Sequence, residues 1–188
     1  RDDVESRGLG DVYKRQKKGF SVIATANTRD KGVNEMSAAL KRRFNIVVLP
    51  TPASLETEID IVKTRVEQLS GGMELNASLP ESDVVEKVCT IFRELRNGET
   101  CDKSQKLKTT TGVLSTAEAI SLLCGSMALA GSFGNGKVSD EDLAAGLAGA
   151  VIKEEDKDVT AWKEYLENVM KKRGSKWSGL YNACRELL

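Results

Sequence analysis

The sequence predicts a mainly α-helical protein in which two strands, a remnant of a parallel α/β core, precede a helical domain. Two short apolar runs, at residues 19–27 and 44–50, are bounded by glycine, proline and polar residues, as buried strands of a parallel sheet are. From residue 53 onward, apolar side chains return every three or four positions, which is typical of amphipathic helices. A chain of 188 residues with 40% hydrophobic side chains is long enough to bury a core.

The first sixteen residues differ from the rest of the chain. They carry four basic and four acidic side chains, show almost no hydrophobic periodicity, and end in DVYKRQ, which resembles translated adapter sequence at the ends of some assembled metagenomic fragments. We expect residues 1–16 to be either such a leader or a natural flexible terminus, and we exclude them from the fold argument. The expected domains are then an α/β part at residues 17–52, a helical domain at 53–153, and a linker with a C-terminal helical extension at 154–188.

Each element has a local signal. A short helix from about Glu35 to Arg42 joins the two strands, a pattern that closes many α/β domains. Ser54 is the expected N-cap of the first long helix, which ends near Gly71. The further helices are expected at residues 80–98, 115–130 and from Ser139 to about 151, and then, after an acidic linker at 154–158, around Trp162 and around Trp177.

The composition excludes several classes of function. The 28 basic and 28 acidic residues cancel, so no global field attracts nucleic acid or an anionic membrane. Without histidine, the chain cannot hold a Ser-His-Asp or Cys-His catalytic group or a zinc site that uses histidine. The four cysteines lie too far apart for a C-x-x-C pair and predict reduced, mostly buried thiols in a cytoplasmic protein. The longest apolar stretch, residues 117–131, is too short and too polar to suggest a membrane span.

Two groups of polar residues flank the predicted strands. Asn27 ends the first strand, at the carboxyl edge where open α/β sheets bind ligands. Arg42 and Arg43 directly precede the second strand, where a planar guanidinium could reach the phosphates of a neighbouring molecule. Taken singly, Asn27 is more typical of a turn cap and the arginines of a solvated basic face. The order strand, loop, helix, arginine pair and strand, taken together, favours a nucleotide-binding site.

These residues together resemble the sensor-1 strand and arginine-finger region of AAA+ ATPases, most closely the MoxR branch. The resemblance is carried by residues 23–30 (IATANTRD) and 34–44 (NEMSAALKRRF). It implies that Asn27 is the sensor-1 residue, which helps to orient the attacking water. It also implies that Arg43, with Arg42 as the alternative, is a finger that acts on the ATP of the adjacent subunit.

The same resemblance carries implications for the whole protein. It implies a ring-forming remodelling or chaperone ATPase that uses ATP and Mg²⁺, with a helical lid and a possible partner containing a von Willebrand factor A domain. The zero net charge and the lack of a long apolar stretch predict neither nucleic acid nor membrane as a partner. MoxR-like lids often carry a sensor-2 arginine, and Thr116 stands at the expected position in this chain.

The sequence departs from the family pattern in its phosphate-binding motifs. No G-x-x-x-x-G-K-[ST] loop and no acidic strand precede residue 19, so ATP and Mg²⁺ would be held mainly by sequence upstream, and we expect residues 1–188 to be inactive alone. Residues 131–137 do fit G-x-x-x-x-G-K, but Val138 replaces the metal-binding Ser/Thr and a helix, not a strand, precedes them. We interpret this segment as a turn between helices.

A different class of function fits the same composition. The neutral charge, the series of amphipathic helices and the lack of a complete catalytic group also suit a non-enzymatic helical module for protein interaction. A phosphate-binding loop in the sequence upstream of residue 17 would favour the ATPase, whereas a start codon there would favour the module. A helical DNA-binding domain is disfavoured by the zero net charge.

Overall fold

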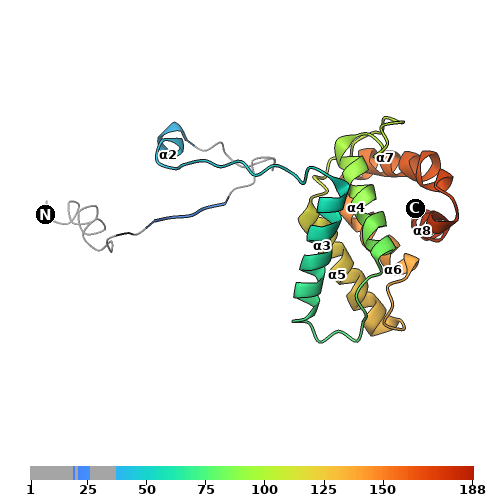
Figure 1. The fold of residues 1–188 in the computed structure, drawn as a ribbon. Coiled ribbons are helices and arrows are strands. Elements are labelled where there is room, and N and C mark those ends of the chain that lie inside the picture. Colours follow the sequence, from blue (N-terminus) through green and yellow to red (C-terminus); the bar gives the residue numbers. More distant parts are fainter. Residues whose placement is uncertain (1–18, 20, 26–36) are drawn as a thin grey trace, which may run out of the picture. The chain divides into compact units, whose positions relative to one another are not determined.

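The computed structural model describes residues 19, 21–25 and 37–188, and the chain divides into two units, residues 1–46 and 47–188. Nearly all of the described secondary structure is helical, and no described residue belongs to a strand (Figure 1). The described elements, in chain order, are α2 (Ala38–Lys41), α3 (Leu55–Ser70), α4 (Ser82–Asn97), α5 (Thr116–Phe133), α6 (Asp140–Val151), α7 (Glu155–Asn168), the 3₁₀ turn η1 (Met170–Lys172) and α8 (Ser175–Glu186).

The two predicted strands are not formed by the described residues. Residues 21–25 and 44–50 have no strand assignment, and their apolar side chains lie exposed, with Ile23 94% and Leu49 86% accessible to solvent. An extended segment needs a neighbour to satisfy its N–H and C=O groups and to cover its side chains. No described segment supplies that neighbour, so the predicted remnant of an α/β core is not seen.

The predicted helices of the second unit are confirmed, and so is the cap at Ser54. The Ser54 hydroxyl accepts a hydrogen bond from the Thr57 N–H at 3.1 Å at the start of α3. Ser115 and Ser139 form reciprocal capping boxes at the starts of α5 and α6. Gly98 ends α4 in the left-handed conformation (φ +69°), which glycine adopts without strain.

The core of the helical domain is organised around α5, which packs against α3, α4 and α6, while α6 packs against α8. The buried side chains of α5 include Leu123 and Met127. By length and composition α5 could cross a membrane, which the sequence analysis did not expect. Core helices often meet the same criterion, and here the apolar side chains contact other helices of the same unit.

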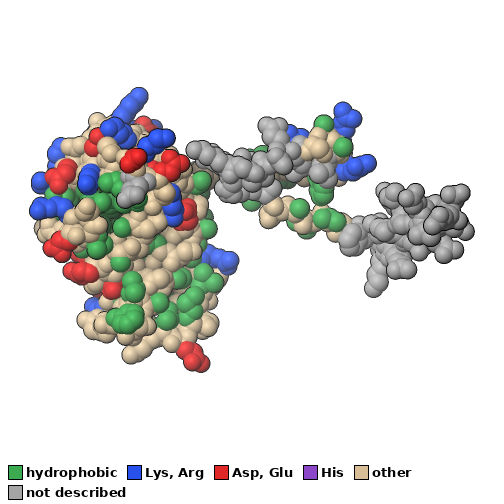
Figure 2. Space-filling model, turned by 180° about the vertical axis from the view of Figure 1, so that it is seen from behind, with side chains coloured by type: hydrophobic (Ala, Val, Ile, Leu, Met, Phe, Trp, Pro, Cys, Tyr) green, Lys and Arg blue, Asp and Glu red, His purple; other side chains and the backbone are tan. Residues whose placement is uncertain are grey.

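The last thirty-five residues belong to the same core. The acidic linker predicted at residues 154–158 is wrong, because α7 begins at Glu155 and the Asp158 side chain is fully buried. Trp162 and Tyr165 are buried and stack with their ring centroids 5.8 Å apart. Some apolar surface stays uncovered: Phe133 is 88% exposed, and hydrophobic side chains gather in the lower part of the helical domain in Figure 2.

Candidate functional site

The predicted arginine pair follows α2 directly. The Arg42 N–H donates to the Ala38 carbonyl at 3.2 Å, so the first arginine closes the last turn of this short helix. Arg42 and Arg43 are both exposed, and neither forms an ion pair with any residue that the structure describes. Asn27, the predicted sensor-1 residue, lies outside the described residues.

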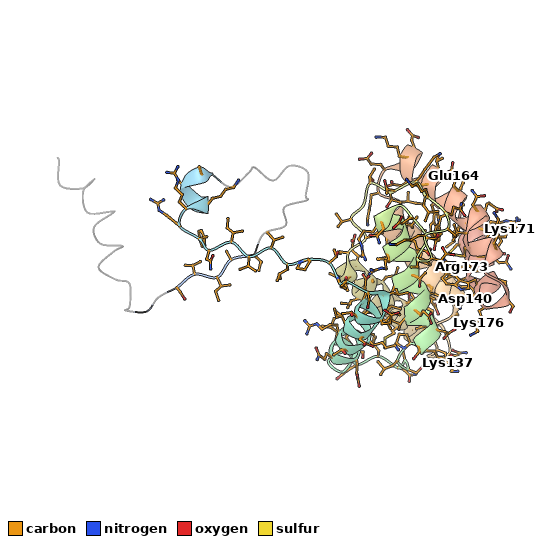
Figure 3. All side chains as sticks on the ribbon, turned by 45° about the horizontal axis from the view of Figure 1, so that its top comes forward. Lys137, Asp140, Glu164, Lys171, Arg173 and Lys176 are labelled. Carbon is orange, nitrogen blue, oxygen red and sulfur yellow. The ribbon has the colours of Figure 1, made fainter. Side chains whose placement is uncertain are left out.

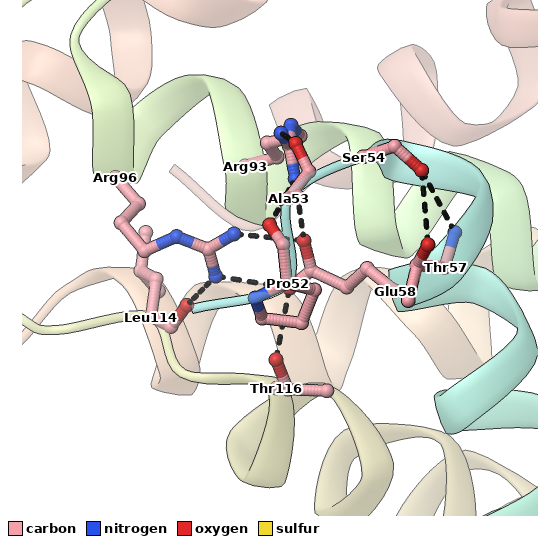
Figure 4. A network of polar contacts seen from close by, with 9 residues as sticks. All are labelled: Pro52, Ala53, Ser54, Thr57, Glu58, Arg93, Arg96, Leu114 and Thr116. Atoms are coloured by element: carbon pink, nitrogen blue, oxygen red, sulfur yellow. Dashed lines mark hydrogen bonds and ion pairs between the residues drawn. The ribbon is translucent and has the colours of Figure 1, made fainter. Parts of the chain in front are cut away.

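A buried carboxylate organises the start of the helical domain (Figure 4). Glu58, in the first turns of α3, is 0% exposed. Arg96 on α4 binds it with both terminal nitrogens, at 3.0 Å to Oε1 and 2.8 Å to Oε2. Arg93, one turn earlier on α4, lies 3.3 Å from Oε2. A buried charge is tolerated only when it is paired and hydrogen-bonded, and two guanidinium groups meet that requirement here.

The same two arginines also hold backbone carbonyl groups. Arg96 donates to the Leu114 carbonyl at 2.8 Å, just before α5. Leu114 has a positive φ of 46°, an uncommon conformation for a branched residue, and its side chain is completely buried. Arg93 donates to the carbonyls of Pro52 at 3.2 Å and Ala53 at 2.7 Å, just before α3. One carboxylate therefore connects the entry to α3, the C-terminal end of α4 and the entry to α5.

Thr116, at the position where the resemblance places a sensor-2 arginine, belongs to this network. Its hydroxyl donates to Glu58 Oε1 at 3.0 Å. Arg96 on α4, and not a residue of α5, carries the positive charge nearest to this carboxylate. The structure therefore gives Thr116 a partner inside the helical domain.

Sequence reasoning missed Glu58, Arg93 and Arg96. A signal was present, because Glu58 stands on the apolar stripe of its helix, four residues before the buried Val62. An acid on a core-facing stripe needs cationic partners. Those partners follow 35 and 38 residues later, so no local pattern identifies them.

A second buried carboxylate, Glu94, joins α4 to the C-terminal helices. The Tyr165 hydroxyl donates to it at 2.7 Å and the Cys101 N–H at 2.8 Å, and Arg173 forms an ion pair with it. Burial, followed by the charge of Glu94, raises the pKa of Tyr165 well above its usual range. Arg173 also lies over the Trp177 ring at 4.7 Å, and Figure 3 shows it in the segment between α7 and α8. Because Arg173 and Glu94 lie 79 residues apart in the sequence, no local pattern predicts this pair.

In the glycine-rich segment at residues 131–137, residues 131–133 end α5, and residues 134–137 form the predicted turn before α6. Gly136 has φ +83°, and a Cβ atom there would lie 2.7 Å from the Asn76 carbonyl oxygen. Lys137 pairs with Glu81 at 3.2 Å, and Val138 packs against the core. The backbone is therefore packed against the loop after α3, and the segment does not fit a phosphate-binding loop.

The cysteines and acids of the described residues offer no further catalytic or metal site. All four cysteines are free, and burial raises the pKa of Cys89 and Cys184 to about 12 and that of Cys101 to about 11. The thiols therefore stay protonated at neutral pH, which makes them poor nucleophiles. Within the part of the chain that the structure describes, no group of three or more Cys, Asp or Glu side chains could hold a metal ion.

Comparison with known families places this helical domain among the AAA+ ATPases. Residues 56–187 match the YehL-like AAA+ ATPase C-terminal domain, and residues 3–44 match the AAA domain of the dynein-related subfamily. The chain therefore belongs to the YehL-like AAA+ ATPase C-terminal domain family. The second match begins inside the segment set aside as a leader.

The curated relative is the uncharacterized protein YehL of Escherichia coli (strain K12). The chain is 34% identical to it over 178 residues, which cover 94% of this chain and 48% of that protein. The chain thus spans about half the length of this relative. No solved structure matches the chain. The predicted relationship to AAA+ ATPases is confirmed, and the assignment to the MoxR branch stays a prediction.

Proposed function

We propose that this chain contributes the sensor-1 residue, a trans-acting arginine finger and the helical lid to an ATP-hydrolysing AAA+ machine. The observation that carries the proposal is the exposed arginine pair, Arg42 and Arg43, directly after α2 in a region that matches an AAA domain. Other arginines of the chain, such as Arg93, Arg96 and Arg173, are committed to buried carboxylates. The exposed pair has no such partner among the described residues.

The chemistry of phosphoryl transfer suits this assignment. The reaction needs positioning and stabilisation of charge on the transferred phosphoryl group more than covalent chemistry. A guanidinium presents a planar fork of donors that matches phosphate oxygens, and it stays charged at any physiological pH. Arg43 would supply that charge to a neighbouring subunit, with Arg42 as the alternative, and Asn27 would orient the attacking water.

The described residues fit only part of an ATP site. The arginine pair suits a contact to phosphate, whereas the segment at residues 131–137 does not fit a phosphate loop and no described acidic cluster suits Mg²⁺. The groups that cradle ATP and Mg²⁺ would therefore come from other sequence of the same protein. A homo-oligomeric ring follows from a finger that acts in trans. A remodelling or chaperone role of the MoxR type, with a partner containing a von Willebrand factor A domain, is part of this proposal.

Steady-state ATP hydrolysis tests the proposal. The assay uses a full-length protein, in which this chain is joined to the rest of an AAA+ domain so that it matches the length of its YehL relative. Arg43→Ala is expected to lower kcat by about 10³–10⁵-fold, the range known for arginine fingers. Arg65→Ala removes an exposed arginine of α3 whose one bond among the described residues is to Gln68, and it should leave kcat unchanged. Wild-type turnover by both Arg43→Ala and Arg42→Ala would show that neither residue is a finger.

A second candidate function rests on the independence of the helical domain. Residues 47–188 bury their own core and hold no complete catalytic group among the described side chains, as a protein-interaction module would. Absence of ATP turnover in the full-length protein, with the helical domain still folded, would favour this alternative.

A further inference from the structure

The segment that leads into the helical domain is tied to it through one side chain. Residues 47–51 have no regular secondary structure and are exposed. Among the described residues, Arg93 makes the only hydrogen bonds to residues 47–53, at the carbonyls of Pro52 and Ala53. The Ser54 cap begins only after this point. The direction in which the chain enters α3 is therefore fixed by one guanidinium group.

Arg93 can bridge these groups because of its shape. Its Nη1 lies 3.2 Å from the Pro52 carbonyl and 3.3 Å from Glu58 Oε2, while its Nη2 lies 2.7 Å from the Ala53 carbonyl. A planar fork reaches three acceptors at once, which the single ammonium of lysine matches poorly. The side chain is 19% exposed, so solvent weakens these bonds only in part.

The buried carboxylate does not depend on Arg93. Without Arg93, Glu58 would still accept two hydrogen bonds from Arg96 and one from Thr116. The buried charge in the core then stays paired, and the carbonyls of Pro52 and Ala53 lose their hydrogen bonds. Arg96 differs, because it neutralises Glu58 and also holds the strained Leu114 backbone. Arg93 can therefore be changed without opening the core.

We propose that Arg93 is a positioning residue that fixes how the connecting segment enters the helical domain. Pro52 follows Arg43 by nine residues, so this segment is the covalent path between the predicted finger and the domain. The bonds at Pro52 and Ala53 restrict the backbone at the end of this segment that joins the domain, whereas an unbonded end would be free to rotate. The coupling to ATP turnover rests on the proposed function, but the anchoring itself does not.

Hydrogen exchange on the 188-residue chain tests the anchoring. In Arg93→Ala, the amides of Thr57 and Glu58, which bond Ser54, should exchange about tenfold faster than in wild type, because two charge-assisted hydrogen bonds that hold the start of α3 are lost. Amides of α6 and α8 should be unchanged. Arg93→Lys keeps the charge and should still show faster exchange, whereas the surface control Arg65→Ala should behave as wild type. Unchanged exchange at Thr57 and Glu58 in both Arg93 variants would overturn the anchoring.

ATP turnover tests the coupling in the full-length protein. Arg93→Ala should lower kcat about tenfold and leave the KM for ATP within about twofold, because ATP is bound by other groups. Arg93→Lys should restore only part of the rate. Faster exchange with unchanged kcat would refute the coupling and keep the anchor. A wild-type protein that does not hydrolyse ATP would refute the proposed function, and the exchange result would still decide the anchor.

Discussion

The two units of this chain differ in how far their apolar side chains are exposed to solvent. In the described part of residues 19–46, Val22 and Ile23 face solvent, whereas the helical domain buries leucines such as Leu95, Leu123 and Leu147 completely. Helices satisfy their own backbone hydrogen bonds and need only a neighbouring helix to cover one face. Strands need partner strands for both purposes. The helical domain is therefore complete in itself, and the predicted strands depend on segments that the described chain does not supply.

The largest loss of stability is expected when the buried charge of the helical domain is removed. Glu58→Ala removes the carboxylate that pairs with Arg93 and Arg96 and leaves two poorly hydrated guanidinium groups. Breaking a buried pair in this way typically costs about 3–5 kcal/mol in the free energy of unfolding. Urea denaturation followed by circular dichroism measures the change. Glu56→Ala, an exposed acid two residues away, should leave the midpoint unchanged, and an equal effect of both variants would contradict the role of Glu58.

A pair of leucines tests the comparison directly. Leu147→Ala should destabilise the helical domain by about 2–5 kcal/mol, because Leu147 is fully buried and its removal leaves a cavity. Leu49→Ala removes the same atoms from a side chain that faces solvent and should not shift the unfolding transition. Thermal unfolding of the two variants measures the difference. A clear loss of stability in Leu49→Ala would show that residues 44–50 pack against a core.

A smaller effect is expected from Asp158, which joins the loop before α5 to the start of α7. Burial acts to raise its pKa, but hydrogen bonds from Glu154, Thr111 and Lys153 outweigh burial and hold the pKa at about 2, below the usual 3.8. The stabilisation is present above pH 3.8 and is lost as the pH falls toward 2.

The shift corresponds to about 2 kcal/mol of stability at neutral pH. Asp158→Asn should therefore lower stability at pH 7 and flatten its decline between pH 4 and pH 2. Asp156→Asn, an exposed neighbour in the same helix, is the matched control. Denaturation at a series of pH values measures both variants. Parallel pH curves for wild type and Asp158→Asn would contradict the assignment.

The helices were predictable because their signals are local. Ser54, Ser115 and Ser139 lie next to the helices that they cap, and Gly98 directly follows the helix that it ends. The linker predicted at residues 154–158 failed for the opposite reason. An acidic run is typical of solvated chain, and the contact that buries Asp158 comes from Thr111, 47 residues earlier.

The candidate site was predictable only in its exposed part. The sequence placed Arg42 and Arg43 at the start of an extended segment, and the structure describes them as exposed. The network around Glu58 joins α3, α4 and α5. The residues in contact are separated by 18 to 58 positions in the sequence, and hydrophobic periodicity does not reveal such distant pairs. The burial expected for residues 44–50 requires neighbouring strands, so it did not follow from the apolar pattern alone.

The most direct test of the central claim is complementation between two impaired full-length variants, Arg43→Ala and Asn27→Ala. If Arg43 serves the neighbouring subunit, a mixed ring contains sites in which an intact Asn27 meets an intact arginine from the next subunit. An equal mixture should then regain up to about a quarter of the wild-type ATP hydrolysis rate. A mixture no more active than the two variants measured separately would contradict a finger that acts in trans.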